Sequence, residues 1–186
     1  MAVAEHLENV MKRTTARRLT PSLLLAGSLL GLSPAANAAP PVPGPPPPNF
    51  SADLPAGQGC PDFALRVEAD GSNVTVRTFV DRKGKTLRTL QAGRGYTLTY
   101  TNLDSGKSVT IRPTGSNRST VTNPDGTFTV TETGTAGIIL FPTDNPKGPS
   151  STQYYGRIVY TLKADGSTLT SLTTSGTSID ICAALA

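Results

Sequence analysis

The stretch that decides the fold is residues 95–113, GYTLTYTNLDSGKSVTIRP. Tyr96, Leu98 and Tyr100 alternate with threonines, and after the DSGK turn Ile111 continues the apolar positions. Alternation with a period of two on both sides of a glycine-bearing loop is typical of two antiparallel strands. This stretch therefore predicts a β-hairpin with one buried face.

The same pattern recurs through residues 59–186, where short alternating runs are separated by turns. The Asp-Gly turns at Asp70, Asp125 and Asp165 supply the left-handed geometry that tight turns need. Each has one aspartate without D-x-D-x-D spacing, so turn formation is favoured over calcium binding. Beyond the hairpin, strands are expected at residues 63–68, 74–80, 87–90, 120–122, 127–131, 138–141, 157–163, 169–172 and 179–182. The sequence predicts a single-domain antiparallel β-sandwich, Greek-key or immunoglobulin-like, with a flattened barrel as the alternative.

The N-terminal residues have the order of a secretory leader. Basic residues at 12–18 precede an apolar run at 22–32, and small residues at 36–38 form a cleavage site. Residues 1–38 are therefore predicted to be a signal peptide, and the protein is expected to be secreted and extracellular. The apolar run is shorter than the roughly 20 residues that cross a bilayer, so no membrane span is expected after cleavage. Met11 is the predicted translation start, and the arginine pair leaves twin-arginine export open beside the Sec route.

Proline dominates the segment after the leader, with PPVPGPPPP at residues 40–48. Such a run favours polyproline II geometry, which makes a semi-rigid spacer without a core of its own. Residues 39–58 are therefore predicted to be a solvated linker, and the folded domain is expected at residues 59–186.

Charge and histidine content narrow the function classes. Four of the 17 basic residues and two of the 13 acidic residues lie in the leader, so the net charge falls from +4 to +2 after cleavage. No basic run marks a nucleic-acid face. His6, the only histidine, is also in the leader. The mature chain therefore lacks the commonest general base and metal ligand, and no cofactor or metal is expected.

Cys60 and Cys182 are the only two cysteines, and both lie in the exported part. An even count in an oxidising compartment predicts one disulfide that ties the first strand region to the last. A reactive thiol pair would need a nearby base or C-x-x-C spacing, and the sequence has neither. For so long a loop, chain entropy gives a stabilisation of about 5 kcal/mol as an upper figure.

Two surface features are candidates for binding. The long loop at residues 143–152, with Lys147, precedes Tyr154 and Tyr155, and long loops on rigid scaffolds often carry ligands. Adjacent residues on a strand point to opposite faces, so this tyrosine pair offers at most one exposed ring.

The second feature is a predicted hairpin tip with four cations: Arg82, Lys83, Lys85 and Arg88. It suits an anionic partner such as a cell-wall polymer, and a solvated turn is the alternative. The T-x-T runs at residues 97–101 and 127–131 are interpreted as exposed strand faces rather than an ice-binding array.

No spacing between residues in the sequence identifies a catalytic group. The acidic candidates are Asp62, Glu68, Asp104, Glu132 and Asp180. No pair of them has a recognisable relation for glycoside hydrolysis, and there is no S-x-x-K motif. No catalytic residue is predicted.

Residues 96–114 (YTLTYTNLDSGKSVTIRPT), the NPDGT turn at 123–127 and the closing IDIC at 179–182 resemble small exported β-proteins of actinobacteria. The resemblance implies an exported β-fold and no assigned activity. We therefore expect a secreted, monomeric, non-catalytic domain that binds or lies at the cell surface. A carboxylate-dependent glycan hydrolase and a proteinase inhibitor presenting residues 143–152 remain the alternatives.

Overall fold

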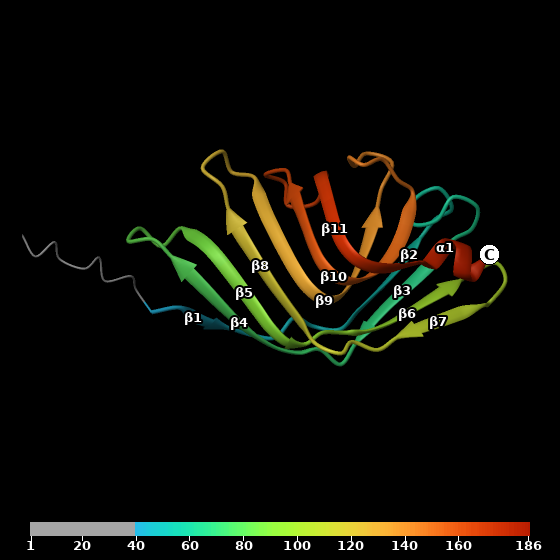
Figure 1. Cartoon of the computed structure of the whole chain (residues 1–186), viewed down its shortest axis with the longest axis horizontal. Coiled ribbons are helices and arrows are strands. Elements are labelled where there is room, and N and C mark those ends of the chain that lie inside the picture. The colour runs from blue at the N-terminus through green and yellow to red at the C-terminus, as the bar shows by residue number, and fades with distance from the viewer. Residues whose placement is uncertain (1–39) are drawn as a thin grey trace, which may run out of the picture. The chain divides into compact units, whose positions relative to one another are not determined.

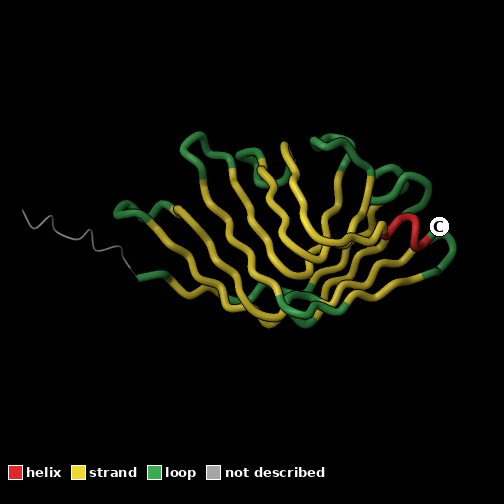
Figure 2. Tube along the Cα trace, viewed as in Figure 1, coloured by secondary structure: helices red, strands yellow, loops and turns green. Residues whose placement is uncertain are grey.

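A computed structural model describes residues 40–186, so the predicted signal peptide and its Met11 start lie outside the described residues. The described chain forms two antiparallel sheets packed together, which confirms the predicted all-β sandwich (Figures 1 and 2). Within these residues no helix is long and apolar enough to cross a membrane. The elements are β1 (Val42–Gly44), β2 (Phe50–Leu54), β3 (Leu65–Asp70), β4 (Asn73–Val80), β5 (Thr86–Arg94), β6 (Thr97–Asn102), β7 (Ser108–Ile111), β8 (Ser116–Thr122), β9 (Phe128–Leu140), β10 (Ser150–Leu162), β11 (Leu169–Asp180) and α1 (Ile181–Leu185).

The chain passes repeatedly from one sheet to the other. The larger sheet has the strand order β1-β4-β5-β8-β9-β10-β11, and the smaller sheet has the order β2-β3-β6-β7. Connections at residues 45–49, 71–72, 95–96 and 112–115 each cross between the sheets. Four strands of the larger sheet are thus joined in sequence to the four strands of the smaller sheet, while β9, β10 and β11 stay in the larger one (Figure 1).

The hairpin predicted at residues 95–113 is present as β6 and β7. Leu98 lies opposite Ile111 in the ladder, and Tyr100 lies opposite Val109. Tyr100 and Ile111 are buried, as alternation predicts. The turn after Asp70 differs from the prediction, because β3 pairs with β6 while β4 pairs with β5. Its glycine redirects the chain locally, but the sheet that receives the next strand is decided by tertiary pairing.

The proline-rich segment is part of the fold, which corrects the predicted linker and domain start. Val42 pairs with Thr78 at one edge of the larger sheet, and Phe50 pairs with Ala69 in the smaller one. Proline cannot donate to a ladder, but an edge strand tolerates it because one side has no partner. Pro43 lies in β1, which is such an edge strand. The prolines therefore break the segment into two short strands instead of keeping it extended in solvent.

A row of small residues crosses the larger sheet. Gly93, Ser116, Gly134, Gly156 and Gly176 lie directly opposite one another in β5, β8, β9, β10 and β11. The four glycines have positive φ angles. A Cβ on Gly134 would lie 2.1 Å from Gly115 O, just before β8, and a Cβ on Gly156 would lie 2.1 Å from Ser175 O in β11. This glycine row lets the backbones approach closely, and the three long strands that carry most of it, β9, β10 and β11, are strongly curved (Figure 1).

The bend also explains why the long strands are predicted as fragments. Residues 127–131 and 138–141 are expected as two strands, but nearly all of both belong to β9. Similarly, β11 joins the predicted strand at 169–172 to residues 179–180. Glycine, serine and threonine interrupt the apolar alternation at the bend, so the sequence pattern predicts a turn there. The β9–β10 ladder nevertheless continues through the bend without a register shift.

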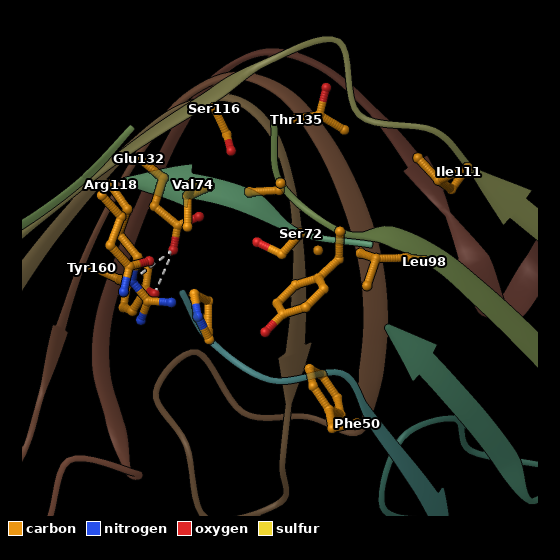
Figure 3. A pocket seen from close by; sticks show the side chains of 16 residues that line it. Phe50, Ser72, Val74, Leu98, Ile111, Ser116, Arg118, Glu132, Thr135 and Tyr160 are labelled. Atoms are coloured by element: carbon orange, nitrogen blue, oxygen red, sulfur yellow. Dashed lines mark hydrogen bonds and ion pairs between the residues drawn. The ribbon is translucent and has the colours of Figure 1, made fainter. Parts of the chain in front are cut away.

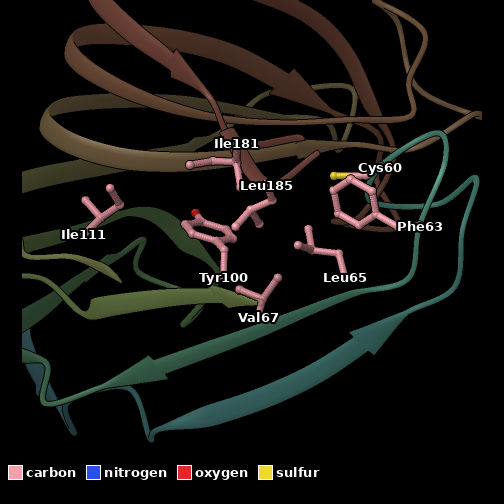
Figure 4. Packing of buried hydrophobic residues seen from close by; sticks show 8 residues of the cluster. All are labelled: Cys60, Phe63, Leu65, Val67, Tyr100, Ile111, Ile181 and Leu185. Carbon is pink, nitrogen blue, oxygen red and sulfur yellow. The ribbon is translucent and has the colours of Figure 1, made fainter. Parts of the chain in front are cut away.

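The sandwich core lies between the two sheets (Figure 4). It consists of Cys60, Phe63, Leu65, Val67, Tyr100, Ile111, Ile181 and Leu185. The predicted Cys60–Cys182 disulfide is present beside this core, with the two Cα atoms 5.5 Å apart. Burial raises the pKa of Tyr100 to about 12, so its hydroxyl stays protonated and donates to Gln153 Oε1 at 3.3 Å.

A second cluster lies along the bent strands β9, β10 and β11. This curved-sheet core consists of Val130, Ala136, Ile138, Leu140, Ile158, Tyr160 and Leu169. Residues from both halves of β9 share this cluster, although the glycine row separates them. The bend therefore folds the long sheet onto its own apolar face.

The C-terminal residues form a helix where the sequence predicts a strand end. Asp180 has an extended backbone and accepts a hydrogen bond from Ala183 N at 3.0 Å, which makes it the N-cap of α1. Ile181 and Leu185, four positions apart, are buried on the same side. The Asn102 side chain donates to Leu185 O at 3.0 Å and closes the other end. Capping by Asp180 thus ends the strand that alternation alone would extend.

Asp144 fastens the two ends of the bent strands to each other. Its carboxylate accepts from Phe141 N at 2.7 Å and from Leu169 N at 2.9 Å, and the residue is buried. Asn145 N donates to Leu169 O at 2.9 Å. The connection between β9 and β10 is therefore held against the start of β11.

Replacing Asp144 by alanine is expected to lower the free energy of unfolding by about 2 kcal/mol, because one buried and one partly buried amide lose their acceptor. Urea denaturation of the disulfide-bonded protein measures this change. Asp104→Ala removes the same charge from an exposed turn and is expected to cost less than about 0.5 kcal/mol. Equal losses in the two variants would contradict a fastening role for Asp144.

Candidate functional site

A cleft of about 240 Å³ lies where β4, β5 and β8 give way to the smaller sheet (Figure 3). It is lined by the β1–β2 connection and by residues of both sheets. The lining residues that carry polar groups or large apolar side chains are Phe50, Ser72, Val74, Gln91, Tyr96, Leu98, Ile111, Ser116, Arg118, Glu132, Thr135 and Tyr160. Of these residues, only Glu132 is predicted from the sequence as a candidate catalytic side chain.

Three polar side chains form the centre of the cleft wall. The Tyr160 hydroxyl donates to Glu132 Oε1 at 2.7 Å, and Arg118 Nε lies 3.5 Å from the same oxygen (Figure 3). The Glu132 side chain is only 12% exposed, whereas that of Arg118 is 41% exposed. Burial raises the pKa of Tyr160 well above its usual range, while the Arg118 charge lowers this pKa and the Glu132 carboxylate raises it. The phenol therefore remains a hydrogen-bond donor at neutral pH.

Strand register places these groups together. Arg118 in β8 lies directly opposite Glu132 in β9, and Gln91 in β5 lies opposite Arg118 on its other side. Directly opposed residues share a face of the sheet. Tyr160 in β10 pairs with Val130, two positions from Glu132, and so faces the same side. The result is a polar row across four strands.

An aromatic pair forms the other side of the cleft. The rings of Phe50 and Tyr96 meet edge to face, with centroids 5.7 Å apart and planes at 84°. The Tyr96 hydroxyl donates to Pro48 O at 2.6 Å, which holds the proline-rich connection against the cleft. Partial burial raises the pKa of Tyr96. Phe50 is 51% exposed, so its ring is accessible at the rim.

Ser72 adds an unused polar group to the cleft. Its Oγ is buried and has no hydrogen-bond partner among the described residues. A buried hydroxyl without a partner costs free energy, and it can both donate and accept. Ser72 therefore offers a bound molecule one hydrogen bond that the protein itself does not use.

The predicted ligand loop is placed elsewhere. Lys147 is exposed in the connection that Asp144 fastens. Tyr155 packs against the sandwich core, whereas Tyr154 packs against the curved-sheet core. The two tyrosines therefore face opposite sides of β10, and neither they nor Lys147 line the cleft.

The predicted basic tip is the β4–β5 hairpin. Arg82, Lys83 and Lys85 are exposed there, and Arg88 follows in β5. Asp81 accepts from the backbone amides of Lys83 and Lys85 at 2.8 and 2.9 Å, which fixes the turn. These four cations are on one hairpin, away from the cleft-lining residues.

The other acidic candidates lie outside the cleft, and three of them share a second hollow. Asp62, Asp104 and Asp180 line a separate hollow beside α1. Glu68 lies opposite Thr99 in the smaller sheet. Within residues 40–186, no three side chains of the His, Cys, Asp and Glu types are arranged to hold a metal ion. Of the carboxylates in the described chain, Glu132 is the one that lines the cleft.

Two Asp-Gly sequences form turns as predicted. Asp165 accepts hydrogen bonds from Ser167 N and Thr168 N at 2.8 and 2.9 Å, and these bonds hold the pKa of its carboxyl far below the usual range. Asp125 accepts from Thr127 in the same manner, through the side chain and the backbone, which lowers its pKa. Their oxygens are thus occupied by the turn itself.

Fold and cleft together define a disulfide-bonded β-sandwich with one polar–aromatic recess among its described residues. No protein-family model, curated protein or solved structure matches this chain. The resemblance to exported actinobacterial β-proteins stays a prediction.

Proposed function

We propose that this protein is a secreted, non-catalytic binding domain whose cleft takes a neutral polyhydroxylated ring, such as one sugar unit of an extracellular polysaccharide. One observation carries the proposal. The paired Arg118, Glu132 and Tyr160 face the same recess as an accessible phenylalanine ring and the unpartnered Ser72 hydroxyl. Apolar walls with a few oriented polar groups are the usual make-up of a small-molecule site.

The chemistry of the cleft favours a neutral ligand. Arg118 and Glu132 compensate each other's charge, so neither an anion nor a cation is favoured. Their remaining donors and acceptors suit hydroxyl groups, which both donate and accept. The volume of 240 Å³ is below the roughly 300–1,000 Å³ of sites for drug-sized ligands, so a single ring fits better than a long chain.

Within the cleft, the number of acidic groups favours binding over glycan hydrolysis. Glycoside hydrolysis generally needs two carboxyl groups on opposite sides of the scissile bond. Among the described residues, Glu132 is the one carboxylate that lines this cleft, and it already accepts a hydrogen bond from Tyr160. Support for export comes from the leader-like residues 1–38 and from the Cys60–Cys182 disulfide, which suits an oxidising compartment.

We expect neutral monosaccharides and short oligosaccharides at millimolar concentration to shift the backbone amide NMR signals of Gly95 and Gly137, which line the cleft. Calorimetry then gives the affinity. Phe50→Ala is expected to weaken binding about tenfold through loss of ring contact. Arg118→Gln is expected to do so by a similar factor through loss of charged hydrogen bonds.

Matched controls separate the cleft from general effects. Val42→Ala removes a similarly exposed apolar side chain from the same N-terminal segment, and Arg112→Gln removes an exposed arginine outside the cleft. Both controls should bind as the unmodified protein does. Absence of shifts at the cleft glycines with every neutral sugar tested would overturn the proposal.

A further inference from the structure

The outward face of the larger sheet carries arginines among hydroxyl groups. Residues directly opposite in the ladder share a face, and the residues between them point the other way. Three such rows lie on the face opposite Glu132 and Ile158. They are Thr75-Ala92-Asn117-Thr133-Arg157-Ser175, Arg77-Leu90-Ser119-Thr131-Val159-Thr173 and Phe79-Arg88-Val121-Thr129-Thr161-Ser171. We call these rows the hydroxyl–arginine face.

This face has positive charge without compensating acid. Arg77, Arg88 and Arg157 are exposed, and the three rows contain no aspartate or glutamate. The ion pairs within residues 40–186 join Arg66 to Asp53 and Arg118 to Glu132, so none involves this face. Arg88 Nε donates to Ser119 Oγ at 3.1 Å, which orients its guanidinium over the sheet.

The basic hairpin tip is continuous with this face. Arg88 belongs to the third row, and Arg82, Lys83 and Lys85 are in the turn that joins β4 to β5. The acidic residue of the turn, Asp81, directs its carboxylate to two amides of the same turn. Positively charged side chains therefore extend from the hairpin tip onto the hydroxyl–arginine face.

We propose that the hydroxyl–arginine face binds a linear anionic polysaccharide that carries carboxylate groups. Charge complementarity selects an anion, because guanidinium groups pair with carboxylates in a planar, two-bond geometry. The serine, threonine and asparagine side chains between the arginines suit sugar hydroxyls. The hydroxyl–arginine face lies on the side of the sheet opposite the cleft. Binding of the polysaccharide there does not depend on the ligand proposed for the cleft.

The distance between the arginines calls for a polymer. Arg77 in β4 and Arg157 in β10 are separated by four inter-strand steps, which at about 4.8 Å each span roughly 19 Å. One sugar unit does not bridge that distance. Nucleic acid is disfavoured because single strands bind by stacking on exposed aromatic rings, and the one ring in these rows, Phe79, is half-buried.

The test measures binding of residues 39–186, the mature chain with its described domain, to polygalacturonate at low and high salt. The variant Arg77→Gln/Arg88→Gln/Arg157→Gln is expected to bind about tenfold more weakly at low salt, since each exposed charge contributes modestly. The control Arg112→Gln/Lys147→Gln/Lys163→Gln removes the same net charge from exposed positions outside the three rows. It should lose less than about threefold.

Circular dichroism and thermal unfolding verify that both triple variants are folded. Retained polymer binding by Phe50→Ala supports independence from the cleft. Equal weakening in the two triple variants would overturn the proposal, because binding would then follow net charge alone. Failure of polygalacturonate to bind at low salt, or tighter binding of duplex DNA than of polygalacturonate, would overturn it as well.

Discussion

Replacing Gly134 by alanine is expected to lower the free energy of unfolding by about 3 kcal/mol, through backbone strain together with a steric clash. Gly134 has a φ angle of +100°, a region that residues with a Cβ rarely adopt. The added Cβ would also lie 2.1 Å from Gly115 O. The oxygen belongs to the backbone and a Cβ has a fixed position on its Cα, so no side-chain rotation can relieve the contact.

The matched control is Gly106→Ala. Gly106 also has a positive φ angle, +74°, but a Cβ there would meet nothing within 4 Å. This variant should therefore show only the conformational cost, about 1 kcal/mol. Urea denaturation followed by circular dichroism gives both values. Equal costs for the two variants would contradict a close backbone approach at the glycine row.

The expected loss is large because the row acts across several strands. Gly134 faces Ser116 on one side and Gly156 on the other, and Gly156 faces Gly176. Separating β8 from β9 at this point also disturbs the bend that brings Ile138 and Ile158 into one cluster. With typical domain stabilities of about 5–15 kcal/mol, such a change removes a substantial share of the total.

The sequence predicts those elements whose pattern is local. Tyr100 and Ile111 follow a strict period of two around a turn, and β6 and β7 form as expected. The two cysteines allow a single intramolecular pairing, and the disulfide is present. A two-residue alternation and a single pair of cysteines can both be recognised without knowing which strands are neighbours. Both predictions are therefore confirmed.

Other elements depend on tertiary context and are missed. Pro43 and its neighbours indicate a solvated spacer, yet an open sheet edge accepts a strand that has no amide to donate. Gly134 interrupts the apolar pattern of β9 and suggests a break, although the ladder continues through it. In both cases the residue disfavours a regular strand locally, but pairing with the neighbouring strand places it in a strand.

The cleft is the least predictable part, because its groups come from separate strands. Arg118 and Glu132 are 14 positions apart in the sequence and become neighbours only through the β8–β9 register. Phe50 reaches the cleft because its segment joins the smaller sheet, contrary to the linker prediction. The predicted Tyr154–Tyr155 pair is divided between the two cores. Adjacency in sequence is therefore a poor guide to this site.

Breaking the Cys60–Cys182 disulfide is expected to lower the free energy of unfolding by up to about 5 kcal/mol, the largest effect we predict. The two cysteines are 122 positions apart, so the bond closes a loop around nearly the whole domain in the unfolded chain. Opening that loop increases the entropy of the unfolded state, and the increase grows with the logarithm of loop length. The native state also loses a tether, because Cys182 belongs to α1, whose Ile181 and Leu185 complete the sandwich core.

Comparing the oxidised protein with the same protein in excess reductant measures this effect without changing any side chain. Denaturant unfolding of the two forms should give different midpoints and a steeper dependence on denaturant for the reduced form, since an unlinked chain exposes more surface. Cys60→Ala/Cys182→Ala serves as the second variant, and it should behave as the reduced protein does. A difference below about 1 kcal/mol would mean that loop closure contributes little here, as is known for cross-links whose unfolded chains retain structure. Packing of α1 by Ile181, Leu185 and Asn102 would then suffice to hold the C-terminus in place.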